Sequence, residues 1–238
     1  MKIHFIINSF SNKLGGAEKL INLIYSNLKK NSINPHILGL LKTDENHSIT
    51  KKSLGFKTTY DLRILFYLKS YVKNNISSND IVHAHLFPTN LYCAILKKLG
   101  YLNAILITTE HSTYNRRRFF FFGKLLDNFI YKSYDHIIAV SKGVKTTLKS
   151  WQPHISNKIT VIHNGCHLIF NHTISRKEKN NVIILSIGQL LKHKNYHTTL
   201  EGLSLIKNHD FKWIIAGDGP QKIELLKKRD LLGLKNKV

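Results

Sequence analysis

A basic loop in the last quarter of the chain carries residue types that bind phosphate. The apolar run Val182 to Ile187 stops at Gly188, and Lys192, His193 and Lys194 follow. Apolar spacing then changes to a helical period, so Lys194 stands just ahead of a predicted helix N-terminus. Free amide groups and the helix dipole favour an anion there. A phosphate is the natural ligand, and the alternative is an ordinary surface loop that happens to be basic.

Histidines follow or end two predicted strands. His83 and His85 share one face of the strand 80–85, which is a conceivable metal pair, but the lack of a nearby third ligand favours hydrogen bonding or contact with an acceptor. His111 and Glu110 come after the strand 104–109. A histidine at the carboxyl end of a parallel strand faces the ligand crevice, so His111 could touch substrate or move a proton. The alternative is a half-buried histidine whose hydrogen bonds are satisfied.

Glycines precede and follow predicted elements where a ligand could reach bare backbone. Gly15 and Gly16 stand before a helical pattern, and they provide either close phosphate contact or a tight turn. Gly217 and Asp218 end the second strand of a predicted β-loop-α-β unit over 181–220, whose loops should lie at the carboxyl edge of a parallel sheet. The pair 164–165, Asn-Gly, is typical of a turn with positive φ.

A basic and aromatic segment runs from Arg116, Arg117 and Arg118 into four phenylalanines, Phe119 to Phe122. In a helix, four successive side chains span about 300° of arc, so at least one phenylalanine should be exposed. Arginines beside exposed Phe119 and Phe120 would suit an anionic bilayer surface. A helix covered by the core and a neighbouring loop is the equal alternative.

The composition limits the classes of molecule that the protein can be expected to bind. The 238 residues have 42% hydrophobic content and 36 Lys and Arg against 14 Asp and Glu, a net charge of +22. This charge attracts polyanions such as nucleic acid, sugar nucleotides or anionic lipid, although many lysines can simply lie on solvated faces. No recognition-helix, RNP or zinc-finger motif occurs, which argues against nucleic acid as a partner. Two distant cysteines fit a reducing cytosol, and the lack of an apolar run of about 20 residues predicts that membrane contact is peripheral.

Strands alternate with helices along the whole chain, which predicts an α/β fold with parallel sheets. Periodicity disappears over 166–181, so we place a domain boundary there, between a first domain at 1–170 and a second at 182–238. The polar segment 42–59 is expected to be a long loop.

Taken together, these residues resemble glycosyltransferase family 4, retaining sugar-nucleotide transferases with two facing Rossmann-like domains, the GT-B architecture. The resemblance rests on the order and spacing of several stretches along the chain. They are Gly15-Gly16-Ala17-Glu18, His83-Ala84-His85, Thr109-Glu110-His111, Val140-Ser141-Lys142, the run from Val161 to Gly165, Gly188-Gln189-Leu190 with Lys194-Asn195, and Gly217-Asp218-Gly219-Pro220.

The resemblance implies roles for matched positions. His111 would contact the transferred sugar in the cleft as the catalytic residue, with Gly16 and Lys194 on the donor diphosphate. The other donor-binding positions would be Gly15, Gly188, Gln189, Gly217 and Asp218, and the acceptor or cleft positions would be His83, His85, Glu110 and Asn164. An arginine normally occupies the place of Gln189 in this family, so one cationic contact is lost. No cofactor or metal is expected beside the nucleotide-sugar co-substrate, and no Asp-x-Asp pair occurs.

The family's Glu-x7-Glu segment would lie beyond Val238, so the second domain is expected to be truncated. We therefore expect a retaining glycosyltransferase of surface polysaccharide or glycolipid assembly, such as lipopolysaccharide, acting on a glycan or lipid-linked acceptor. It would be cytoplasmic or peripheral at the inner face of the cell membrane. The alternative is a non-catalytic fragment, or one half of a split enzyme, that serves as a binding module.

Overall fold

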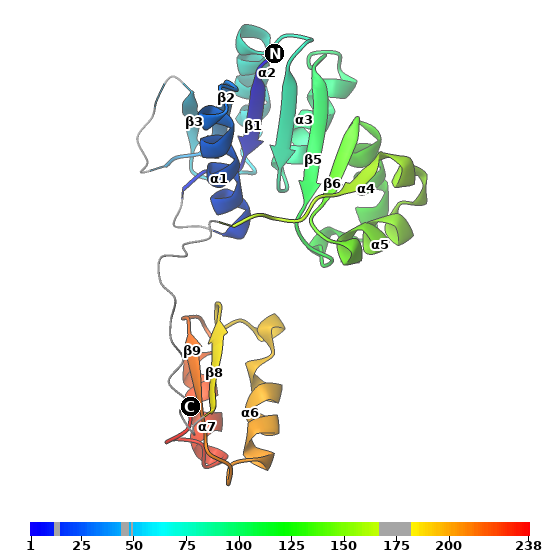
Figure 1. Cartoon of the computed structure of the whole chain (residues 1–238). Coiled ribbons are helices and arrows are strands. Elements are labelled where there is room, and N and C mark those ends of the chain that lie inside the picture. The colour runs from blue at the N-terminus through cyan, green and yellow to red at the C-terminus, as the bar shows by residue number, and fades with distance from the viewer. Residues whose placement is uncertain (12–14, 44–47, 49, 167–181) are drawn as a thin grey trace. The chain divides into compact units, whose positions relative to one another are not determined.

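The computed structural model describes residues 1–11, 15–43, 48, 50–166 and 182–238. The chain divides into two compact units, residues 1–169 and 170–238 (Figure 1).

The first unit is built on a seven-stranded sheet in which every pair of neighbouring strands is parallel. Its order is β3-β2-β1-β4-β5-β6-β7. From β1 the chain adds β2 and β3 toward one edge of the sheet, and it then crosses back to place β4 on the other side of β1. The direction reverses between β1 and β4, which is where ligands bind in open α/β sheets. The strands are β1 (Ile3–Ile7), β2 (Pro35–Leu41), β3 (Lys51–Phe56), β4 (Ile81–His85), β5 (Ile105–Glu110), β6 (His136–Ala139) and β7 (Ile159–Val161).

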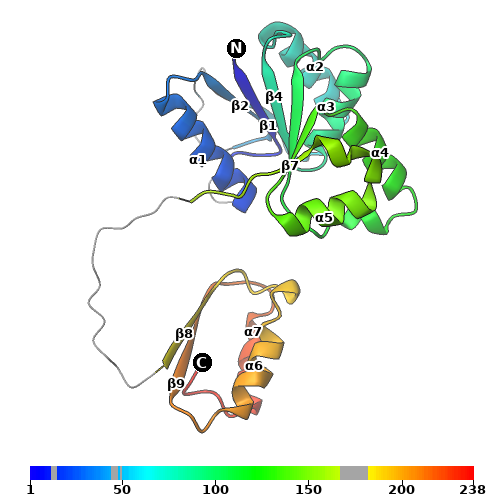
Figure 2. The same ribbon diagram turned by 45° about the vertical axis from the view of Figure 1, so that its right-hand side comes forward.

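Helices cover the two faces of this sheet unequally. One helix, α1 (Gly16–Lys30), lies on one side, and the others lie on the opposite side (Figure 2). Those others are α2 (Arg63–Asn75), α3 (Thr89–Lys98), α4 (Gly123–Lys132) and α5 (Lys142–Trp151), with the 3-10 turns η1 (Arg116–Phe119) and η2 (Pro153–Lys158) between elements.

The period of two along each strand decides which face a residue joins. Phe5 and Ile7 pack against Ile21 and Tyr25 of α1, whereas Ile6 belongs to the larger core on the opposite face. Burying one such side chain stabilises the fold by about 1.5–3 kcal/mol. The same alternation leaves His83 and His85 on the α1 side of β4, because Val82 and Ala84 belong to the larger core.

The prediction of a long loop over 42–59 is wrong, because β3 lies within it and pairs with β2. The strand is only half-buried and sits at the edge of the sheet, so it needs hydrogen bonds on one side only. Its sequence, KKSLGF, therefore lacks the apolar run that marks a central strand.

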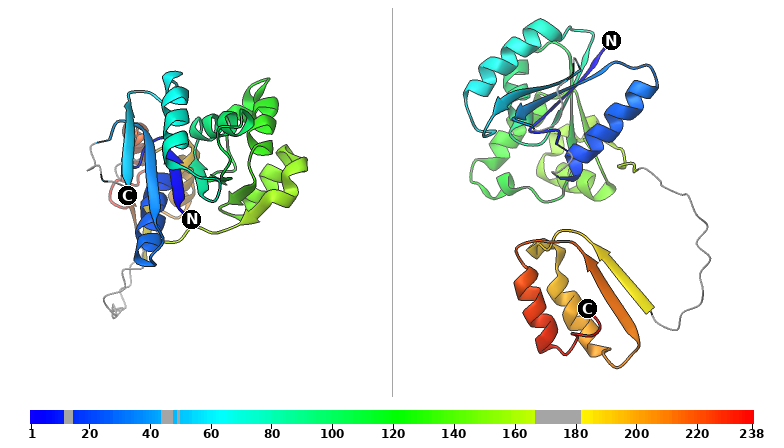
Figure 3. Two further views of the ribbon diagram at one scale, coloured as in Figure 1. Left: turned by 90° about the horizontal axis from the view of Figure 1, so that it is seen from above. Right: turned by 90° about the vertical axis from the view of Figure 1, so that its left-hand side faces the viewer.

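The second unit contains the predicted β-loop-α-β arrangement. Strands β8 (Val182–Ile187) and β9 (Phe211–Ala216) are parallel along their full length. The turn η3 (Lys192–Lys194) and the helix α6 (Tyr196–Leu205) connect them, and α7 (Lys222–Leu231) follows. Both helices cover the same face of the sheet, around buried Leu200, Trp213 and Leu225 (Figure 3).

Glycines after β9 allow two loop backbones to touch. A Cβ atom on Gly217 would overlap the carbonyl oxygen of Gly188, and one on Gly219 would lie 2.7 Å from that of Leu190. The Leu190 amide donates to the Asp218 carbonyl at 2.9 Å. Packing of the loop after β8 thus explains these glycines without a ligand.

Within the residues described, no helix combines the length and apolar character needed to cross a membrane.

Gly217→Ala should destabilise the second unit by about 1–3 kcal/mol, since the new methyl group forces two backbones apart. The matched control is Gly202→Ala in α6, where no atom lies within 4 Å of the added Cβ and a gain of up to about 1 kcal/mol is expected. Urea denaturation followed by Trp213 fluorescence, with Trp151 replaced by Phe, measures both. Equal midpoints for the two variants would contradict the packing role.

Candidate functional site

The carboxyl edge of β4 and β5 brings three histidines together. In the parallel pairing His85 stands beside Thr109, so His111 follows two residues further along the same face. The rings of His83 and His85 lie 4.0 Å apart between centroids, and those of His85 and His111 lie 5.6 Å apart. Sequence reasoning named all three residues, and the structure gathers them into one cluster.

Two hydrogen bonds organise the cluster. His83 Nε2 lies 2.8 Å from Thr109 Oγ1, and His85 Nδ1 lies 3.3 Å from His111 Nε2. For His83 and His85 the sequence favoured hydrogen bonding or contact with an acceptor over a metal pair. Both form hydrogen bonds, and in the part of the chain that the structure covers no three His, Cys, Asp or Glu side chains are arranged to hold a metal ion.

Burial keeps the three imidazoles neutral. It lowers the pKa of His83 to about 3 and that of His111 to about 4, and nearby His111 reinforces the effect at His83. The pKa of His85 falls well below its usual range for the same reasons. A neutral imidazole offers one donor and one acceptor. The cluster therefore suits hydroxyl groups better than phosphate.

A cavity of about 580 Å³, here named the α1 cavity, opens beside this cluster. Leu20, Leu23 and Ile24 form an apolar wall on α1, and His83 and His85 lie opposite. Polar side chains complete its lining: Asn27, Asn31, Thr109, His163 and Asn164. A mixed wall of this kind fits a ligand that has both apolar and hydroxyl groups.

Gly16 and Asn164 also meet at this edge. They line a neighbouring cavity of about 270 Å³ together with Lys19 and Gly165. A Cβ atom at Gly16 would meet nothing within 4 Å, whereas one at Gly15 would lie 3.1 Å from the Glu18 carboxylate. The backbone at the start of α1 is thus open to a ligand at Gly16.

Glu110 points away from the α1 cavity. It is buried, its Oε1 accepts a hydrogen bond of 2.6 Å from the Tyr131 hydroxyl of α4, and burial raises its pKa. Together with His111 and Thr109 it lines a third cavity of about 200 Å³, here named the η1 cavity.

Arg117 is not available for membrane contact, so that prediction is wrong. Its side chain is buried, and its Nε donates to Asp127 Oδ1 at 2.8 Å. The guanidinium also lies 4.6 Å from the centre of the Phe87 ring. Trp151 donates to the other oxygen of Asp127, so the pair ties η1 to α4 and α5.

All four phenylalanines of the basic-aromatic segment are exposed, from 68% for Phe122 to 92% for Phe121. The segment forms the 3-10 turn η1 and a turn before α4 instead of the considered helix. No described element covers it, so the alternative of a covered helix is wrong. Arg116 is exposed beside it and Arg118 is half-buried.

In the second unit the predicted donor residues gather at the carboxyl edge of β8 and β9. Lys194 is exposed at the end of η3, and its Cε lies 3.9 Å from where a Gly188 Cβ would stand. Its ammonium group has no ion pair among the described residues. Gln189 and Asp218 are exposed at the same edge, and Asp218 lies 3.6 Å from Lys222 Nζ.

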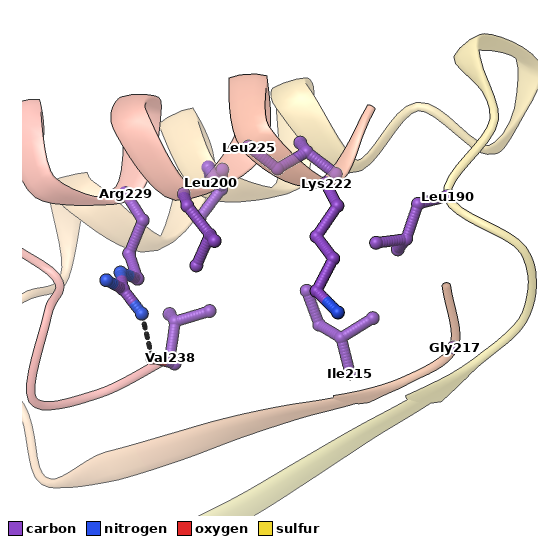
Figure 4. A pocket seen from close by; sticks show the side chains of 9 residues that line it. Leu190, Leu200, Ile215, Gly217, Lys222, Leu225, Arg229 and Val238 are labelled. Carbon is purple, nitrogen blue, oxygen red and sulfur yellow. Dashed lines mark hydrogen bonds between the residues drawn. The ribbon is translucent and has the colours of Figure 1, made fainter. Parts of the chain in front are cut away.

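A small cavity of about 180 Å³ between the helices and β9 is lined by Gly217 and Lys222 but not by Lys194, Gln189 or Asp218 (Figure 4). Leucines of α6, α7 and the loop after β8 line it, and Arg229 donates to the Val238 carbonyl at its end. Lys222 and Arg229 line it among mainly apolar side chains, but Lys194 and Gln189 do not, so this cavity is separate from the predicted phosphate site.

Sequence reasoning missed the partners of the named residues. Thr109 supports His83, Tyr131 supports Glu110, and Asp127 neutralises Arg117. Thr109 could have been found, because it stands two residues before His111 in the stretch Thr109-Glu110-His111. Tyr131 and Asp127 lie on a helix with no local pattern that links them to the edge.

Comparisons with known proteins agree with this arrangement. A family model described as Glycosyltransferase Family 4 matches residues 14–169, and one described as Glycosyl transferases group 1 matches residues 169–238.

Two curated relatives are similar over nearly the whole chain. One is the GalNAc-alpha-(1->4)-GalNAc-alpha-(1->3)-diNAcBac-PP-undecaprenol alpha-1,4-N-acetyl-D-galactosaminyltransferase of Campylobacter jejuni, 27% identical over 99% of this chain and 66% of the relative. The other is the amylovoran biosynthesis glycosyltransferase AmsD of Erwinia amylovora, 22% identical over 95% of this chain and 65% of the relative. The chain thus spans about two thirds of the length of these relatives.

Solved structures share the fold. The lipopolysaccharide outer core galactosyltransferase WaaB superposes with a TM-score of 0.73 at 16% identity, over 100% of this chain and 67% of that one. Anabaena Alr3699/HepE in complex with UDP-glucose superposes with a TM-score of 0.76 at 18% identity, over 100% and 68%. These likenesses confirm the predicted fold class of two Rossmann-like domains.

Lowering the pH from about 7 to 5 should destabilise the first unit through the buried histidines. In the unfolded chain a histidine takes up a proton below about pH 6.5, whereas folded His83 stays neutral down to about 3. Between these two pKa values, such a residue lowers the free energy of unfolding by about 1.4 kcal/mol for each pH unit of acidification. His83→Gln keeps a polar group for Thr109 and cannot titrate, so its stability should depend less on pH by about that amount.

Urea denaturation at several pH values, followed by Trp151 fluorescence with Trp213 replaced by Phe, measures this difference. Glu110 contributes in the opposite direction because its pKa is raised, but it does so equally in both proteins. Identical pH slopes with and without His83 would contradict the neutral state of this residue.

Proposed function

Because this chain belongs to glycosyltransferase family 4, we propose that it acts as a retaining glycosyltransferase. It transfers a sugar from a nucleotide-sugar donor to a glycan or lipid-linked acceptor during assembly of surface polysaccharide or glycolipid. The observation that carries the proposal is Lys194, an exposed cation without an ion pair in the described chain, at the N-terminus of α6 and beside Gly188.

Lys194 and the first amides of α6 hold the donor diphosphate. Cleavage of a sugar–phosphate bond leaves negative charge on the diphosphate oxygens, and a fixed lysine with helix amides stabilises that charge as it develops. Gln189, exposed on the same loop, adds hydrogen bonds without charge. Complexes of Anabaena Alr3699/HepE with UDP and with UDP-glucose support a nucleoside diphosphate at such a fold, with no resident cofactor or metal proposed.

On the first unit, Gly16 offers open backbone to the donor and His111 contacts the transferred sugar. Its neutral ring matches sugar hydroxyls, which both donate and accept hydrogen bonds. His83, His85 and Asn164, which line the α1 cavity, serve the acceptor side. The named substrate of the Campylobacter jejuni relative, a glycan on undecaprenol diphosphate, supports a lipid-linked acceptor. Retention of configuration follows from the family.

The protein should bind UDP or GDP, and Lys194→Ala should weaken that binding by about 1.5–3 kcal/mol, the worth of a hydrogen bond to a charged group. Isothermal titration calorimetry measures the affinity. Release of nucleoside diphosphate from a panel of UDP- and GDP-sugars with lipid-linked acceptors measures turnover. Lys192→Ala, in the same exposed turn, is the matched control and should change affinity by less than about 0.5 kcal/mol.

Equal losses of nucleotide affinity for Lys192→Ala and Lys194→Ala would contradict a specific site at Lys194. They would indicate a general attraction of the nucleotide to a basic loop. Binding without turnover for every donor and acceptor would instead favour the non-catalytic alternative, a sugar- or lipid-binding module.

We further propose that the segment Phe119–Phe122 docks the protein on an anionic bilayer at the inner face of the cell membrane. Four exposed rings follow one another in the chain, exposed Leu125 comes three residues later, and exposed Arg116 and Lys124 lie on either side in the sequence. Aromatic rings at the acyl boundary and cations at the headgroups are the elements of interfacial binding. The net charge of +22 acts in the same direction.

Replacing both Phe121 and Phe122 by Ser should weaken binding to vesicles of equal parts phosphatidylglycerol and phosphatidylcholine at least about tenfold, because two rings no longer enter the interface. Co-sedimentation with the vesicles measures this. The control replaces Phe66 and Tyr67 of α2, which are 74% and 57% exposed, and should bind like the unaltered chain. The proposal fails if both double variants bind equally, or if vesicles of pure phosphatidylcholine bind as well.

A further inference from the structure

The bond between His85 and His111 couples the protonation of two histidine rings that line different cavities. His85 lines the α1 cavity and His111 lines the η1 cavity. Their contact joins Nδ1 of His85 to Nε2 of His111 at 3.3 Å. A hydrogen bond needs one donor and one acceptor, so only one of these two nitrogens carries a proton at a time.

Each neutral ring has one proton, so the pair has two arrangements. If His85 donates from Nδ1, its Nε2 is an acceptor and the proton of His111 is on Nδ1. If His111 donates from Nε2, His85 carries its proton on Nε2 and Nδ1 of His111 is an acceptor. The role of His111 Nδ1 is therefore opposite to that of His85 Nε2 in both arrangements.

His85 Nε2 has no hydrogen-bond partner among the described residues, although the side chain is only 1% exposed. A buried polar nitrogen left unpaired is costly, so a ligand that reaches it gains a bond that the protein does not supply. Within the cluster, His83 Nε2 is already bonded to Thr109, so it does not compete for that ligand. The α1 cavity is large enough for a sugar ring and is polar on this side.

We propose that His85 is a positioning residue that sets which nitrogen of His111 carries the proton, and that a ligand hydroxyl in the α1 cavity bonds to His85 Nε2 and selects the arrangement. A hydroxyl that donates to His85 Nε2 leaves His111 Nδ1 as a donor, and a hydroxyl that accepts from it leaves His111 Nδ1 as an acceptor. The ligand class is carbohydrate. The inference rests on the proposed function only in taking His111 as the residue that contacts the transferred sugar.

Two substitutions separate the two nitrogens of His85. Asparagine places its amide near the Nδ1 position, so His85→Asn keeps a partner for His111 and loses the ligand contact. Glutamine reaches the Nε2 position, so His85→Gln keeps the ligand contact and loses the partner of His111. His163→Gln is the matched control, because His163 lines the same cavity but bonds to the Val140 carbonyl.

NMR shifts of the ring nitrogens of isotopically labelled histidine report the tautomer of His111 without substrate or turnover. The shifts should change in His85→Gln and remain as in the unaltered protein in His85→Asn and His163→Gln. Glucose, used as the carbohydrate probe, should shift the His111 signals in the unaltered protein and in His163→Gln but in neither His85 variant. In the turnover assay, His85→Gln should lower kcat about tenfold with the donor KM unchanged.

Unchanged His111 shifts in His85→Gln would overturn the positioning role. An equal glucose response in the unaltered protein and both His85 variants would overturn the ligand contact. Because these signals need no donor, a chain without turnover would end the proposed function while the tautomer result still decides this inference. Unaltered urea midpoints by Trp151 fluorescence show that each variant is folded.

Discussion

Parallel pairing of β1, β4 and β5 is the constraint on which the rest of the first unit depends. Parallel strands bring all their carboxyl ends to one edge, and the period of two then decides which side chains share a face. The register that sets His85 beside Thr109 also places His111 within reach of His85. Asn8, just after β1, bonds to the Phe87 carbonyl and to Thr89, which closes the same edge across the point where strand order reverses.

Much of the fold followed from the sequence, because most elements carry their own signal. The apolar run Val182 to Ile187 and the change of period after Lys194 predicted β8 and α6 correctly. β3 was missed for a physical reason. An edge strand that is hydrogen-bonded on one side and half-exposed can be built from Lys51, Lys52 and Ser53, and such residues equally suit a loop.

The sequence indicated which histidines lie at the carboxyl edge of the sheet, but not which hydrogen bonds they form. His83, His85 and His111 were identified because they lie at or near the ends of predicted strands. No local pattern reveals that His85 bonds to His111, since 26 residues separate them. For Arg117 the sequence prediction itself was wrong. Between Arg116 and Arg118 it looked like part of one basic surface, yet only Arg117 turns inward, because Asp127 of α4 offers it a buried carboxylate. The sequence shows charge, whereas burial depends on the partner that the fold supplies.

The ion pair between Arg117 and Asp127 has a mechanical consequence for the loop of exposed phenylalanines. Asp127 also receives the Trp151 indole, and Tyr131, one turn further along α4, bonds to Glu110 next to His111. The segment Phe119 to Phe122 is thus joined through α4 to the end of β5, where His111 lies. In the proposed docking on a bilayer, the depth to which these rings enter would therefore fix the height of His111 above the membrane.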